Sequence, residues 1–94
     1  MSGDADAAKT VADNLRERVR RAIGLPEQDV ESISVLIDAG EWQVALEVLC
    51  TQMYEYDIEP DADERARLQA LGDQLNVPVR YLMGDPWAER EGER

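Results

Sequence analysis

The stretch GEWQVALEVLCTQMYEYDI, residues 40–58, has the apolar spacing of an amphipathic helix and decides the fold. Its opposite face carries Glu47, Thr51 and Glu55, with Tyr54 at the edge. We therefore expect one buried face, with Tyr56 half-buried at its end and Tyr54 exposed. At 100° per residue the core-facing stripe consists of Trp42, Ala45, Leu46, Leu49, Cys50, Met53 and Tyr56.

Two more amphipathic segments precede this helix. One spans about residues 7–23 and ends in the cationic run RVRR, which complements the dipole of a helix carboxyl end. The other spans about residues 27–39. Gly24 stops the first segment, and Gly40 follows the second, where a left-handed residue is needed to end a helix. The apolar stripe of the first segment is Val11, Leu15, Val19 and then Ala22 or Ile23.

A fourth segment begins after Pro60. Asp61 followed three residues later by Glu64 is a capping-box pattern, in which each residue satisfies a backbone N–H of the first turn. The stretch VRYLMGDPW, residues 79–87, then predicts a last helical turn or an ordered extension. The apolar stripe of the fourth segment is Leu68, Leu71 and Leu75.

Short loops between amphipathic helices predict an all-α fold, a small antiparallel bundle of four helices or five. The 94 residues suffice for one core. We expect a disordered amino terminus over residues 1–6, a single helical domain over residues 7–82, and an extended or disordered tail over residues 83–94. No apolar run approaches the roughly 18–20 residues of a membrane span. With one cysteine and no leader-like segment, the sequence predicts a cytoplasmic protein that contacts no membrane.

The sequence contains few of the side-chain combinations that enzymes usually use for catalysis. The sequence has no histidine, the commonest general acid–base residue and metal ligand, so Cys50 has no imidazole to activate it. The alternation Asp57, Glu59, Asp61, Asp63 resembles a calcium loop, but Ala62 stands where the loop needs glycine and Leu68 where it needs glutamate. We expect no enzyme activity, no catalytic residue, no metal and no cofactor.

Negative charge is concentrated in the middle of the chain. The formal net charge is −11, and residues 22–64 contain twelve acids and no lysine or arginine. Self-repulsion of this kind destabilises a monomer, so a role other than stability is indicated; solubility alone is the simplest alternative. The run LGDQLNVPVRYLMGD resembles the closing helix of phage-repressor domains, but this acidic middle would repel phosphate, so we expect no nucleic-acid partner.

A basic protein partner fits this charge pattern. Tyrosine supplies rigid contact area at interfaces and can stack on cationic side chains. The candidate partner-binding residues lie at the end of the central helix and the loop after it, with a second set on the two middle helices. They are Tyr54, Glu55, Asp57, Glu59, Asp61 and Asp63, and then Glu31, Asp38 and Glu47.

Residues 36–60, LIDAGEWQVALEVLCTQMYEYDIEP, resemble the MafI-type immunity proteins of bacterial polymorphic-toxin systems. The resemblance covers about residues 30–82. It rests on Gly-Glu, Ala-Leu-Glu, Leu-Cys and Tyr-Glu-Tyr in this order, followed by a leucine-periodic helix. The charged first helix and the tail depart from the family pattern. The resemblance implies a small helical protein in the cytoplasm of the toxin producer, which binds and blocks the toxic domain of its cognate protein, often a nuclease.

The sequence therefore predicts an immunity protein, a monomer that forms a heterodimer with a basic toxin domain through its acidic surface. The alternative is a helical adaptor or regulatory domain that binds a basic protein outside a toxin system. Both hypotheses rest on the same charge pattern, and this pattern does not identify the toxin's activity.

Overall fold

Five helices form in the computed structural model, which describes residues 3–84 and their side chains from Thr10 onward. The predicted all-α bundle is confirmed, and residues 3–84 contain no strand. None of the helices in this part of the chain combines the length and apolar composition needed to cross a bilayer. The helices are α1 (Gly3–Arg21), α2 (Glu27–Asp38), α3 (Trp42–Glu55), α4 (Ala62–Leu75) and α5 (Val79–Leu82).

The bounds of α1 differ most from the sequence expectation. The helix begins at Gly3 rather than at residue 7. It ends at Arg21, two residues before the expected end. Of the expected tail over residues 83–94, all but Met83 and Gly84 lies outside the described residues.

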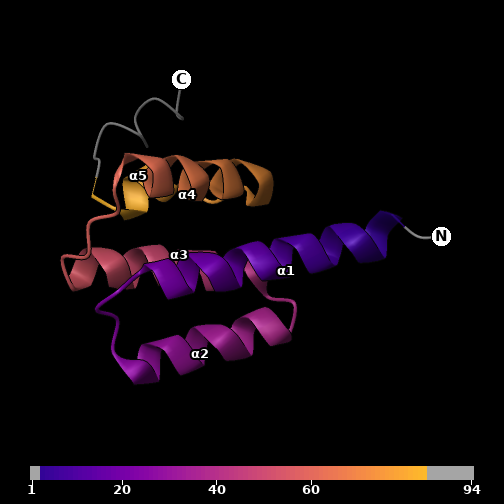
Figure 1. The fold of residues 1–94 in the computed structure, drawn as a ribbon, viewed down its shortest axis with the longest axis horizontal. Helices are drawn as coiled ribbons and strands as arrows, with labels where there is room; N and C mark the ends of the chain where they lie inside the picture. The colour runs from indigo at the N-terminus through magenta and orange to yellow at the C-terminus, as the bar shows by residue number, and fades with distance from the viewer. Residues whose placement is uncertain (1–2, 85–94) are drawn as a thin grey trace.

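Consecutive long helices run in opposite directions (Figure 1). Two polar contacts hold the α2–α3 pair at its two ends. At one end the indole N–H of Trp42 donates to the carbonyl of Ile37 at 3.2 Å. At the other end Nε2 of Gln52 donates to the carboxylate of Asp29 at 3.1 Å. The start of α3 therefore meets the end of α2, and the end of α3 meets the start of α2.

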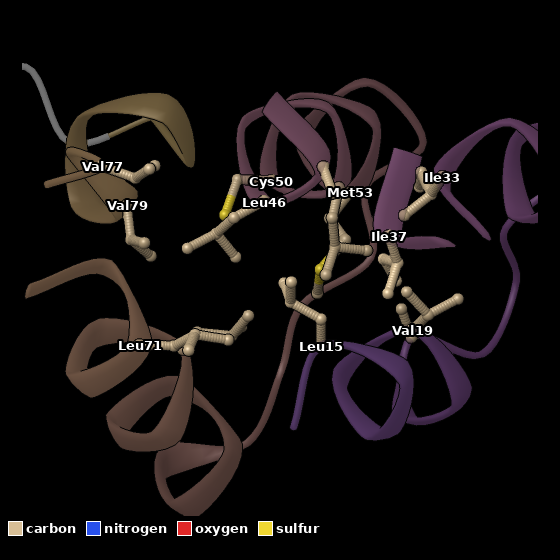
Figure 2. Packing of buried hydrophobic residues seen from close by; sticks show 14 of the residues in the cluster. Leu15, Val19, Ile33, Ile37, Leu46, Cys50, Met53, Leu71, Val77 and Val79 are labelled. Carbon is tan, nitrogen blue, oxygen red and sulfur yellow. The ribbon is translucent and has the colours of Figure 1, made fainter. Parts of the chain in front are cut away.

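The core lies between α1, α3 and α4, with α2 and α5 closing its sides (Figure 2). Every helix contributes a residue that is at most 2% exposed, among them Leu15, Ile33, Leu46, Leu71 and Val79. From the stripes expected in the third and fourth segments, Ala45, Leu46, Leu49, Cys50, Met53, Leu68 and Leu71 are buried, and Trp42 and Leu75 are partly buried against them.

Helix ends decide how the residues at the ends of the predicted stripes are placed. Because α1 stops at Arg21, Ala22 turns into the core at 4% exposed and Ile23 turns out to solvent at 85%. Because α3 stops at Glu55, Tyr56 no longer follows the 100° spacing and is 48% exposed.

Arg18 and Glu64 form an ion pair inside the bundle. Nη1 of Arg18 donates to Oε1 of Glu64 at 2.8 Å, and the two side chains are 5% and 12% exposed. Half of the predicted capping box is present: Asp61 accepts from the backbone N–H of Glu64 at 2.8 Å. The carboxylate of Glu64 instead crosses to α1. Burial raises the pKa of Glu64, against the opposing charges of Arg18, Arg21 and Arg67.

Candidate functional site

All nine predicted partner-binding residues are exposed. Six of them follow one another where α3 ends and α4 begins; we call this set the acidic end. The other three lie along α2 and α3 and do not join it. Asp38, the last residue of α2, lies at the far end of that helix from the Asp29–Gln52 contact. The acidic end consists of Tyr54, Glu55, Asp57, Glu59, Asp61 and Asp63.

Some acids among the nine candidate residues have a compensating contact, and the others have none. Asp38 accepts from Arg16 at 2.8 Å and Asp63 from Arg67 at 3.0 Å, so each has a cation beside it. Asp61 caps α4. Among the described side chains, no ion pair reaches the remaining five acids, which are Glu31, Glu47, Glu55, Asp57 and Glu59. Three of these five belong to the acidic end, which makes it the densest uncompensated charge on the candidate surface.

Asp57 occupies a backbone position that normally belongs to glycine. Its φ is +54°, in the left-handed region. The N–H of Ile58 donates to the carbonyl of Met53 at 2.8 Å and that of Asp57 to Tyr54 at 3.2 Å, so the helix ends in a Schellman motif. At the end of α2 the same two bonds form at 2.9 and 3.0 Å around Gly40, whose φ is +80°. One helix end thus has the expected glycine, and the other has a carboxylate.

Backbone strain in a non-glycine residue is concentrated at functional sites. Aspartate tolerates the left-handed region better than most residues, but it still carries a Cβ that glycine lacks. The Asp57 carboxylate also lies two residues from Glu55 and two from Glu59 in a segment without cations. Local geometry and charge both disfavour an acid here, so stability does not explain the residue.

The two tyrosines at this end of α3 are held differently. Tyr54 is 57% exposed, and its ring rests on Gly84, where an added Cβ would lie 2.5 Å from Cε1. Tyr56 faces α2, and its pKa is raised by the charge of Asp29, by burial and by a hydrogen bond with Asp29. Tyr54 therefore packs on Gly84 and exposes much of its ring to solvent, while Tyr56 is hydrogen-bonded to α2.

Sequence reasoning missed the apolar surface that adjoins the acidic end. Ile23, Ile58 and Pro60 lie there in one hollow. The only signal in the sequence was the unresolved choice between Ala22 and Ile23 for the stripe of the first helix, because the loop that carries Ile58 and Pro60 is distant in the chain.

A second hollow, of about 440 Å³, lies between α4 and α5 and has cationic walls. Arg65 and Arg80 line it together with Ala62, Ala66, Gln69 and Met83. Its charge is opposite to that of the acidic end, so the two features do not form one site.

The structure offers little for covalent or metal chemistry. Burial raises the pKa of the Cys50 thiol to about 12, so this thiol is not ionised at neutral pH. Within residues 3–84 no group of three potential ligand side chains could hold a metal ion. The site is therefore a surface of carboxylates and aromatic edges, suited to binding cations.

Comparison of the chain with family models, curated proteins and solved structures gives no significant match. The similarity to MafI-type immunity proteins thus remains a prediction from the residues of the Gly-Glu to Tyr-Glu-Tyr stretch.

Proposed function

We propose that this protein is an immunity protein, which binds the toxic domain of a cognate bacterial polymorphic toxin and blocks it through the acidic end. The observation that carries the proposal is the grouping of Glu55, Asp57 and Glu59, without a cation among the described side chains, beside the exposed ring of Tyr54. The resemblance of residues 30–82 to the MafI-type family supplies the kind of partner.

A nuclease toxin holds phosphate with lysine and arginine, and such a surface complements unpaired carboxylates. Electrostatic steering of this kind raises association rates to on the order of 10⁸ M⁻¹s⁻¹ at low salt. Tyr54 adds a rigid aromatic contact on which a cationic side chain can stack. In this proposal the protein acts in the cytoplasm of the toxin producer, without a cofactor, as one half of a heterodimer.

The experiment uses the toxic domain encoded beside this chain, because toxin and immunity genes are neighbours in such systems. Cells that express the toxic domain alone should stop growing, and co-expression of this chain should restore growth. Purified chain should bind the inactivated domain with a 1:1 stoichiometry in isothermal titration calorimetry. Absence of both protection and binding would exclude the proposal. Tight binding to a basic protein that has no toxicity would favour the adaptor alternative.

A further inference from the structure

Ile23 is the most exposed large apolar side chain among the described residues, at 85%. It follows the end of α1 and precedes Gly24, whose backbone passes the side chain of Ile58 with φ at +112°. A single exposed isoleucine is ordinary in itself. Its surroundings are unusual, because Ile23 lines a hollow together with residues of the acidic loop.

The hollow has a volume of about 390 Å³ and is built from three elements, the end of α1, the loop after α3 and the first turn of α4. Its apolar part includes Ile23, Ile58 and Pro60, with buried Met53 beneath. Its remaining lining residues are charged: Glu59, Asp61, Asp63, Glu64 and Arg21.

Most of these charged groups already have a partner. Arg21 donates to Glu17 at 2.8 Å, Glu64 is bound to Arg18, and Asp63 is bound to Arg67. Glu59 and Asp61 have no ion pair with a described side chain. Oε2 of Glu64 receives no hydrogen bond, but it is shielded from solvent, as is Nε of its partner Arg18, so this pair is not open to a ligand. The hollow therefore offers apolar surface together with two carboxylates, Glu59 and Asp61, that have no cation paired with them among the described side chains.

We infer that this hollow receives an arginine side chain of the toxic domain, an inference that rests on the proposed function. The methylene stem of an arginine would cover Ile23, Ile58 and Pro60, and its guanidinium would donate to Glu59 and Asp61. An apolar side chain would desolvate these carboxylates without pairing them, and an acidic one would be repelled. Arginine fits better than lysine because its planar group makes several hydrogen bonds at once and is less strongly hydrated.

The first test is calorimetric titration of the inactivated toxic domain into three variants. Ile23→Ser removes the apolar mouth, and Glu59→Gln removes one unpaired charge. Val35→Ser, on α2, is the matched control, since Val35 is also aliphatic and is 66% exposed. We expect each of the first two changes to weaken binding about tenfold, as truncation of an interface anchor does. The control should bind within about twofold of the parent protein.

A parent-like dissociation constant for Ile23→Ser and Glu59→Gln would overturn the inference while leaving the proposed function standing. Loss of binding in Val35→Ser alone would also overturn it, because the interface would then lie on α2. Circular-dichroism melts of all three variants exclude unfolding as the cause, and we expect no change because each substituted side chain is exposed.

A second arm separates failure of the hollow from failure of the proposed function. N-acetyl-arginine amide is titrated into protein labelled at the isoleucine methyl groups, with N-acetyl-citrulline amide as the neutral isostere. The methyl signals of Ile23 and Ile58 should shift with the arginine compound alone, while those of buried Ile33 and Ile37 stay in place. If the toxic domain does not bind but these shifts occur, the hollow is an arginine site for another basic partner. Equal shifts with both compounds, or none, would overturn the inference.

Discussion

Replacement of Asp57 by glycine should separate folding from binding. Glycine carries no Cβ, so it removes the left-handed penalty, roughly 1–2 kcal/mol for an ordinary L-residue and less for aspartate. Greater freedom of glycine in the unfolded chain offsets about 0.5–1 kcal/mol of this gain. Loss of one like charge between Glu55 and Glu59 adds a few tenths of a kcal/mol in favour of folding. Asp57→Gly should therefore be as stable as the parent protein, or up to about 1 kcal/mol more stable.

The measurement is a circular-dichroism melt, in which 1 kcal/mol corresponds to a shift of about 4–8 °C for a domain of this size. Asp57→Asn is the companion variant, because asparagine tolerates the left-handed region and differs from aspartate mainly in charge. Both variants should bind the toxic domain more weakly than the parent protein while unfolding no earlier. Gly40 shows that glycine is compatible with this helix ending, because it ends α2 with the same two hydrogen bonds. If Asp57→Gly unfolds more than about 4 °C earlier, Asp57 stabilises the fold, and its charge needs no functional explanation.

Three further predictions concern the core, the buried ion pair and the interface. Leu49 is fully buried in the middle of α3, so Leu49→Ala should cost about 2–5 kcal/mol in urea unfolding, and an unchanged midpoint would refute the packing described here. Glu64→Gln leaves the Arg18 guanidinium uncompensated and should cost about 3 kcal/mol, whereas Arg18→Met with Glu64→Leu should cost much less; an equal loss in both proteins would contradict this account of the pair. The association rate with the toxic domain should fall steeply between low and physiological salt while dissociation changes little, and stopped-flow rates independent of salt would indicate an apolar interface.

Local rules in the sequence predicted the helices well. Apolar spacing located α2, α3 and α4, and the left-handed glycine at position 40 is confirmed. The cap at Asp61 is confirmed as well. These features depend on residues within a few positions of one another, which is the range over which propensity and capping act.

Features that depend on distant contacts were not predictable in this way. Arg18 lies in the cationic last turn of the first helix, as the sequence indicated, but its burial against Glu64, 46 residues away, had no signal in the sequence. Arg16 likewise compensates Asp38 from 22 residues away, so the charge pattern alone overstated the free charge of the second candidate patch. Exposure of Tyr54, and of Glu47 and Glu55 on the face of α3 opposite the core, was predicted correctly, whereas the hollow beside Ile23 required the meeting of three elements.

The central claim is that the acidic end binds the toxic domain, and its most direct test is growth of cells that express that domain. The decisive variant carries Glu55→Gln, Asp57→Asn and Glu59→Gln, and it is compared with a variant carrying Glu27→Gln, Glu31→Gln and Glu47→Gln. Both lose three negative charges from exposed positions, so solubility and net charge change equally. We predict that the first variant folds but no longer protects the cells, while the second protects as the parent protein does. Full protection by the first variant would contradict the claim.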